Sequence, residues 1–325
     1  MEDTEQGKTS NILIRDLRKS DLNGLQTLFP ACFTKELEIQ GFDRDRLTRM
    51  VNRVFGTTGT IFLGLMRLLG KEPVKLLVAE ADGKVVGTTI VNNRRQSGYI
   101  STVMVHPDYR RRGIATRLMT YALGYIRKRK KVRAVLDVDS VNTGAKNMYI
   151  KLGFKPFDQE MYLVRDTNPP HKPEEDSKVK IREFQKSDLD EVYRLIQASE
   201  DSNSLRILDF NKKDLEIPFF QRMFRFGTRK KLVAVIGDKI VGYVEVGYTT
   251  PKEAGRINSV EADSEAKSFY IEKLLIVAAN DEIVKAGIPR IRLTAMTAKK
   301  ETIETAKNLG FLEALVMDVM VKELQ

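Results

Sequence analysis

The chain has 325 residues, more than one ordinary hydrophobic core holds and enough for two domains. Apolar residues are 42% and charged residues 30%, which is typical of a globular protein, and no apolar run reaches the roughly 20 residues of a membrane helix. One cysteine, Cys32, and two histidines exclude an internal disulfide and the usual zinc site, so we expect no metal and a reducing, cytoplasmic location. The net charge of +11 favours anionic partners without choosing among them.

The first half predicts alternating strands and helices in a mixed sheet, an α/β (α+β) pattern. A short strand leads to Ser20, a favoured N-cap residue at the start of a helix. After a variable segment, Asp82-Gly83 joins two strands in a hairpin. An arginine-rich loop then opens an amphipathic helix that ends near Arg129, and Gly153 stands where a helix end needs a left-handed residue. The expected strands cover residues 13–15, 74–80, 85–91, 99–105, 132–138 and 161–164.

The second half repeats the first. "IRDLRKSDL" at Ile14 returns as "IREFQKSDL" at Ile181, "LVAEADGKVVG" returns as "LVAVIGDKIVG", and "KLGF" returns as "NLGF". The matches keep their order, which indicates a tandem duplication. The segment "RDTNPPHKPEEDSK" between them has three prolines and no apolar periodicity, as a linker does. We therefore predict domains at residues 1–165 and 179–325, joined by a linker at 166–178.

Only the first copy keeps the arginine loop. From the third strand to the last helix the copies align without a gap at an offset of 157 residues. A purely structural loop would be kept in both copies, so we hypothesise that this loop binds a ligand or does chemistry in the first. The alternative is a solvated turn. In this register Arg110, Gly113, Ala115, Asn142 and Tyr149 correspond to Lys267, Tyr270, Glu272, Lys299 and Ala306.

The loop has the properties of a diphosphate site. A strand that enters a helix through a tight turn directs several backbone N–H groups to one point, and the helix dipole adds to them. Gly113 and Ala115 let a phosphate approach the backbone, and Thr116 adds a hydroxyl. The arginines at 110–112 can neutralise the charge through forked hydrogen bonds. A diphosphate fits such a nest better than a single carboxylate.

The run "VMVHPDYRRRGIATRLM" resembles the acyl-CoA signature of the GNAT superfamily of N-acetyltransferases. The downstream run "NTGAKNMYIKLGF" resembles the second signature of that family, and the resemblance covers about residues 13–164. It implies two tandem GNAT-like (acyl-CoA N-acyltransferase) domains. The first would transfer an acetyl group from acetyl-CoA, the cosubstrate, to a primary amine by direct attack. The second would be a degenerate copy, because Tyr270 would block the phosphates and Glu272 would repel them.

The resemblance also implies roles for individual residues. Asn142 would fix the pantetheine arm, with a helix N-cap as the alternative. Tyr149 would protonate the leaving thiolate, with a core aromatic residue as the alternative. The strand residues Met104 and Val105 would pair with the pantetheine arm. The diphosphate would be held by Arg110, Arg111, Arg112, Gly113, Ile114, Ala115 and Thr116.

The attacking amine must be neutral, so the reaction needs a base. The strand "YISTVMV" has no carboxylate to act as one. The candidates are Glu80 on an earlier strand and the pair Asp137 and Asp139, which alternate along the strand before Asn142. For Glu80, a salt-bridged or exposed strand residue is the alternative.

The sequence leaves the acceptor open between a small-molecule amine and a protein amine, and it is compatible with a homodimer. We expect no membrane partner and no nucleic-acid partner, since no aromatic residues interleave with the basic run at 127–131. The insert at 33–73 is expected either to pack on the core or to wall the acceptor pocket. A second hypothesis is a regulatory module that binds acyl-CoA without turnover and would be indifferent to Tyr149→Phe.

Overall fold

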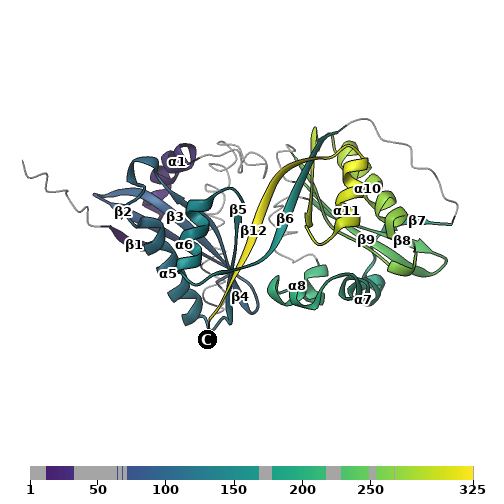
Figure 1. Ribbon diagram of the computed structural model, residues 1–325, viewed down its shortest axis with the longest axis horizontal. Helices are drawn as coiled ribbons and strands as arrows, with labels where there is room; N and C mark the ends of the chain where they lie inside the picture. The colour runs from purple at the N-terminus through teal and green to yellow at the C-terminus, as the bar shows by residue number, and fades with distance from the viewer. Residues whose placement is uncertain are drawn as a thin grey trace, which may run out of the picture. The chain divides into compact units, whose positions relative to one another are not determined.

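The structure is a computed structural model that describes residues 12–32, 64, 68, 72–167, 178–216, 228–248, 254–266 and 268–324 (Figure 1). The chain divides into two compact units. Unit 1 consists of Met1–Pro156 and Met320–Gln325, and unit 2 of Phe157–Val319. Most of the insert at 33–73 and of the linker at 166–178 lies outside the described residues. None of the helices in the described part is long and apolar enough to cross a membrane.

In unit 1 the strands β1 to β4 form an antiparallel sheet, and β5 extends it by pairing parallel with β4. One face of this sheet is covered by α5, whose Ile114, Leu118, Ala122 and Ile126 are buried at helical spacing. Helix α5 lies close to the sheet, since a Cβ on Gly98 would be 2.6 Å from Ile126. The elements are β1 (Leu13–Asp16), η1 (Lys19–Asp21), α1 (Leu22–Ala31), β2 (Val74–Ala81), β3 (Lys84–Asn93), β4 (Ser97–Val105), η2 (Pro107–Tyr109), α5 (Ile114–Lys128), β5 (Arg133–Asp139) and α6 (Thr143–Lys151).

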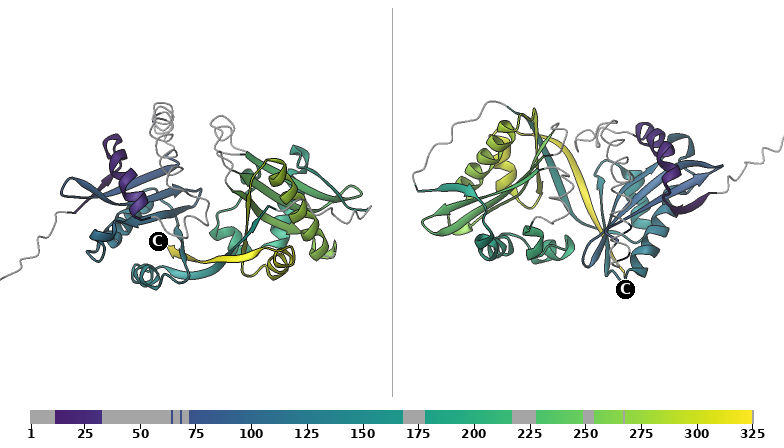
Figure 2. Two further views of the ribbon diagram at one scale, coloured as in Figure 1. Left: turned by 90° about the horizontal axis from the view of Figure 1, so that it is seen from above. Right: turned by 180° about the vertical axis from the view of Figure 1, so that it is seen from behind.

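Unit 2 repeats this order, with α10 in the place of α5 and α7 in the place of α1 (Figure 2). A Cβ on Gly255 would be 2.5 Å from Ile283, so α10 lies as close to its sheet as α5 does. The elements are β7 (Lys180–Glu183), η3 (Lys186–Asp188), α7 (Leu189–Ser199), α8 (Ser202–Ile207), η4 (Lys212–Leu215), β8 (Thr228–Ile236), β9 (Lys239–Tyr248), β10 (Gly255–Ala262), η5 (Ser264–Ala266), α10 (Ser268–Lys285), β11 (Arg290–Met296) and α11 (Lys300–Asn308).

The last strand of each copy, β6 (Lys155–Asp166) and β12 (Leu312–Glu323), is divided between the two units (Figure 1). β6 belongs to unit 2 from Phe157 onward, and β12 belongs to unit 1 from Met320 onward. The sequence placed residues 161–164 in the first domain, but β6 pairs antiparallel with β11 inside unit 2, with Leu163 opposite Leu293. The end of β12 completes unit 1 instead. Met320 and Leu324 join the core of unit 1, and the Leu324 N–H donates to the Val132 carbonyl at 2.8 Å. Two copies with equivalent apolar strands give no sequence signal for this exchange, so the compact units do not follow the predicted boundary at 165.

This arrangement predicts that unit 1 depends on the last residues of the chain. Met320 is 1% exposed in the core of unit 1, so we expect Met320→Ala to destabilise that unit by about 2–4 kcal/mol. Amide hydrogen exchange of β5 measures this loss. Leu312→Ala is the matched control, because Leu312 lies on the same strand and is 71% exposed. Equal protection of β5 in the two variants would contradict the assignment of these residues to unit 1.

Candidate active site

The centre of the site is a gap in the pairing of β4 and β5. Their parallel pairing ends at Ile100 and Leu136, although both strands continue. β4 turns away here because its pairing with β3 shifts register and Thr102 adopts a left-handed φ of 58°. No described strand pairs with this edge of β4 beyond Ile100. The edge includes Met104 and Val105, which the sequence assigned to the pantetheine arm.

The arginine loop follows directly from the end of β4. Arg111 and Gly113 have left-handed φ values of 64° and 74°, and Gly113 is the N-cap of α5. Residues in this conformation are typical of backbone nests that bind anions. A Cβ on Gly113 would meet nothing within 4 Å, so the space before the helix is open. The side chains of Arg111, Arg112 and Thr116 are exposed around it, as a phosphate site requires.

Side-chain contacts of Arg110 and Arg112 brace the loop. The Arg110 Nε donates to the Val105 carbonyl at 3.1 Å, and its guanidinium also contacts the thiol of Cys32 at the end of α1. Burial raises the pKa of this thiol, and the charge of Arg110 opposes the shift. Arg112 donates to the Asp108 carbonyl at 3.1 Å. The sequence assigned Arg110 only to the diphosphate, and the structure adds that it holds the end of β4 in place.

Helix α6 carries the two residues of the second signature to which the resemblance gave roles, Asn142 at its N-cap and Tyr149 near its end. The side-chain oxygen of Asn142 accepts from the Ala145 N–H at 3.1 Å, so the N-cap interpretation of Asn142 is confirmed. Tyr149 is 6% exposed and lies in the core, where its ring meets Phe154 edge-on with centroids 6.0 Å apart. Its burial fits the core interpretation, and its role as an acid stays a prediction.

Asp137 lies on the face of the sheet opposite α5, because its neighbours Leu136 and Val138 are in the α5-facing core. Its Oδ1 accepts a hydrogen bond from the hydroxyl of Tyr99, and the guanidinium of Arg94 lies 4.3 Å from the centre of the Tyr99 ring. Burial raises the pKa of Asp137 to about 6, and the charge of Arg94 opposes this rise. A carboxylate with this pKa is deprotonated at neutral pH and more basic than an ordinary aspartate.

Sequence reasoning missed Tyr99. The signal was available in the alternation of β4, since Gly98 and Ile100 face α5 and Tyr99 must face the other way. The third candidate carboxylate, Asp139, is the last residue of β5, and its Oδ1 accepts from the Val141 N–H of the following turn at 3.1 Å. Asp137 is therefore the carboxylate of β5 that remains directed to the sheet face.

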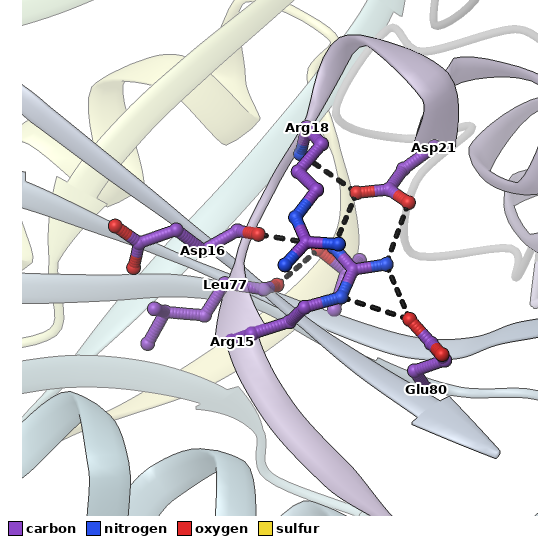
Figure 3. A network of polar contacts seen from close by, with 7 residues as sticks. Arg15, Asp16, Arg18, Asp21, Leu77 and Glu80 are labelled. Carbon is purple, nitrogen blue, oxygen red and sulfur yellow. Dashed lines mark hydrogen bonds and ion pairs between the residues drawn. The ribbon is translucent and has the colours of Figure 1, made fainter. Parts of the chain in front are cut away.

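Glu80 is held in an ion pair at the edge of the sheet (Figure 3). Its Oε2 accepts from the Arg15 Nε at 2.8 Å and from the same guanidinium at 2.5 Å. Arg15 also pairs with Asp21 at 2.6 Å, and this hydrogen bond holds the pKa of Asp21 below its usual value. The equivalent pair in unit 2 joins Arg182 and Asp188 at 2.6 Å. The salt-bridged interpretation of Glu80 is confirmed.

Unit 2 fills the corresponding gap with its own side chains. The parallel pairing of β10 and β11 also stops before the strands end. Lys299, at the position of Asn142, donates to both carboxylate oxygens of Glu261 at 2.7 Å and pairs with Glu200 at 2.7 Å. Burial raises the pKa of Glu272, at the position of Ala115, to about 7. Helix α10 begins at Ser268, so helical turns replace the loop that precedes α5 in unit 1.

The family model described as "Acetyltransferase (GNAT) family" matches residues 30–154. An acetyltransferase of Sodalis glossinidius is 33% identical over 101 residues, which cover 31% of this chain and 71% of that protein. The chain belongs to the GNAT acetyltransferase family. An uncharacterized N-acetyltransferase of Methanocaldococcus jannaschii is 33% identical over 95 residues, 27% of this chain. The match spans 42% of that relative's own length.

Solved structures match both GNAT units together. A tandem GNAT protein from the clavulanic acid biosynthesis pathway has a TM-score of 0.67 at 15% identity, and 96% of this chain and 98% of that chain are covered. A GCN5-related N-acetyltransferase from Sphaerobacter thermophilus has a TM-score of 0.65 at 18% identity, covering 96% and 95%. These likenesses confirm the predicted fold of two tandem GNAT-like domains. Among the residues that the structure describes, no group of three or more His, Cys, Asp or Glu could hold a metal ion.

The raised pKa of Asp137 predicts a pH-dependent cost in stability. Its folded pKa of about 6 lies above the unfolded value of about 3.9, so ionisation destabilises the fold as pH rises between the two. We expect Asp137→Asn to be more stable than wild type by about 2 kcal/mol at pH 7, and equal to it below pH 4. Urea unfolding at a series of pH values measures the difference. A variant that is less stable at pH 7 than wild type would contradict the burial of this charge.

Proposed function

We propose that the chain is an acetyl-CoA-dependent N-acetyltransferase whose unit 1 transfers an acetyl group to a primary amine. The observation that carries the proposal is the open edge of β4, which leads from Ile100 into the loop at Gly113. This combination offers main-chain donors and acceptors for an amide-containing arm and an anion nest for a diphosphate. Membership of the GNAT acetyltransferase family supports acetyl transfer as the reaction.

Residues of unit 1 divide the work of binding. The N–H groups of residues 111–116 and the exposed side chains of Arg111 and Arg112 would hold the diphosphate of acetyl-CoA. Met104 and Val105 would hold the pantetheine arm through their main chain. When bound, acetyl-CoA supplies a thioester carbonyl activated for attack by an amine.

The transfer needs a base and an acid. Asp137 takes the proton that the amine loses, and the amine nitrogen attacks the thioester carbon. The C–N bond forms, the C–S bond breaks, and Tyr149 gives a proton to the leaving thiolate. Glu80 is not assigned a proton transfer, because its carboxylate is already bound by Arg15.

Free thiol released from acetyl-CoA in the presence of a panel of amines tests the proposal. The panel includes polyamines, amino acids, lysine peptides and peptides with a free N-terminus. We expect amine-dependent release with at least one class. Tight CoA binding with no amine-dependent release across the panel would instead support the regulatory module that binds acyl-CoA without turnover.

A matched pair of glycine variants tests the diphosphate loop. Gly113 and Gly83 have φ values of 74° and 75°, and a Cβ on either would meet nothing within 4 Å. Gly113→Leu and Gly83→Leu should therefore lose similar stability, about 1–2 kcal/mol. We expect only Gly113→Leu to weaken CoA binding, by at least about tenfold in Kd measured by calorimetry. Equal CoA affinity in the two variants would place the diphosphate elsewhere.

A second pair of variants tests the choice of base. Wild-type kcat/KM should rise with pH through about 6, because protonated Asp137 cannot accept the amine proton. We expect Asp137→Asn to lose this rise of kcat/KM with pH, and we expect its kcat to be lower by about 100-fold or more. Glu80→Gln should keep the rise and lose about 1 kcal/mol of stability through its weaker contact with Arg15. If Glu80→Gln abolished the rise and Asp137→Asn kept it, the two roles would have to be exchanged.

A further inference from the structure

Three arginines gather on the face of the unit 2 sheet that α10 does not cover. Residues of β10 and β11 that face α10 lie in the apolar core, including Ile257 and Leu293. Arg256 and Arg292 alternate with them and are direct neighbours in the parallel register. Arg229 of β8 lies on the same face, because the residue after it, Lys230, points to α10 and pairs with Glu282 there.

Two of these arginines, Arg229 and Arg256, lie near the carboxylate of Glu245. The Arg229 guanidinium binds Glu245 through both its Nε, at 2.9 Å, and an Nη atom. Four groups act on the charge of Arg256: Glu245 and Tyr162 favour it, and Arg292 and Arg229 oppose it. No described residue accepts a hydrogen bond from the half-buried Arg256. Burial lowers the pKa of Arg256, and the charge of Arg292 lowers it further.

A second observation points to a ligand at this position. The Oγ1 of Thr294 is buried and has no hydrogen-bond partner. Thr294 follows Arg292 by two residues on β11 and therefore lies on the same face. The guanidinium of Arg292 lies 4.8 Å from the ring centre of Tyr162, which is the register partner of Thr294. The Tyr162 ring stacks on the guanidinium of Arg292 and keeps the N–H groups of Arg292 on this face of the sheet.

The same face of unit 1 carries a carboxylate where unit 2 has the hydroxyl of Thr294. At the offset of 157 residues, Arg256 replaces Tyr99, and Thr294 replaces Asp137. The carboxylate that would receive an amine proton in unit 1 is therefore replaced by a hydroxyl in unit 2, and a guanidinium takes the place of the Tyr99 phenol. A half-buried guanidinium is unfavourable when its neighbouring carboxylate, Glu245, is already bound by Arg229, and an oxyanion lowers that cost by accepting its N–H groups.

We propose that unit 2 binds a small multivalent oxyanion, a phosphate or a polycarboxylate, between Arg256, Arg292 and Thr294. Guanidinium groups on adjacent strands present parallel donor pairs to two oxygen atoms of the ligand, and the Thr294 hydroxyl donates to a third. The site needs no coenzyme A and no acetyl transfer, so it stands or falls independently of the function proposed for unit 1.

Calorimetric titration of the full chain with inorganic phosphate and with citrate, at constant ionic strength set by chloride, tests this site. We expect saturable binding of at least one of the two anions, and the one bound more tightly identifies the ligand geometry. Arg256→Met should raise the Kd by at least about tenfold, and Arg256→Lys should be intermediate because it keeps the charge and loses the fork. Arg256→Met should also melt higher than wild type without anion, because a desolvated charge is removed.

Arg290→Met is the matched control. Arg290 precedes Arg292 on the same strand, is exposed, and pairs with Asp166 at 3.3 Å. We expect its Kd for the anion to equal that of wild type. The proposal is overturned if neither anion binds at constant ionic strength, or if Arg256→Met and Arg290→Met retain the same affinity. If Arg256→Met does not fold, Thr294→Val provides the second test, with an expected loss of about threefold or more.

Discussion

The parting of β4 from β5 is the constraint on which the rest of unit 1 depends. A strand edge carries N–H and C=O groups that need partners, and Ile100 is the last residue of β4 that finds them on β5. The left-handed Thr102 sets the bend. Because the loop at Gly113 and the start of α5 continue from this strand, an unpaired edge and a set of main-chain donors lie along one path. We propose that a cosubstrate with an amide-containing arm and a diphosphate uses both.

Unit 2 keeps the same bend in its strand, but there one of its own side chains binds a main-chain group at the strand edge. Ser259 repeats the left-handed conformation of Thr102, with a φ of 49°. The ammonium of Lys299 then donates to the Val260 carbonyl on the edge of β10 and to the carboxylate of Glu261, which is 2% exposed. A buried ion pair thus takes the place that we propose for a ligand in unit 1, and α10, which begins at Ser268, has helical turns in place of the loop. The two units share a scaffold and differ in what completes it.

Local signals in the sequence predicted local structure well. Asp82 and Gly83 both have positive φ, as their hairpin turn requires, and Asn142 caps α6 as its residue type favours. The repeat predicted the order of elements in both units, because both copies carry the same pattern. The arginine loop was recognised because it opens an amphipathic helix, because the second copy lacks it, and because its residues resemble the GNAT acyl-CoA signature.

Contacts between residues far apart in the chain could not be predicted from the sequence. Nothing in the apolar pattern of β6 and β12 distinguishes one copy's sheet from the other's, so their exchange could not be predicted. The ion pair of Glu80 with Arg15 joins residues far apart in the chain, and so does the hydrogen bond of Tyr99 to Asp137. Such contacts decide which carboxylate is free to act as a base, and residue type alone left them open.

Hydrogen–deuterium exchange of the full chain with and without coenzyme A tests the central claim most directly. Our account predicts that the ligand protects the amides of residues 101–105 and 111–116 and leaves those of residues 258–262 and 268–272 unchanged. Protection confined to the second set, or absent from both at saturating coenzyme A, would contradict it.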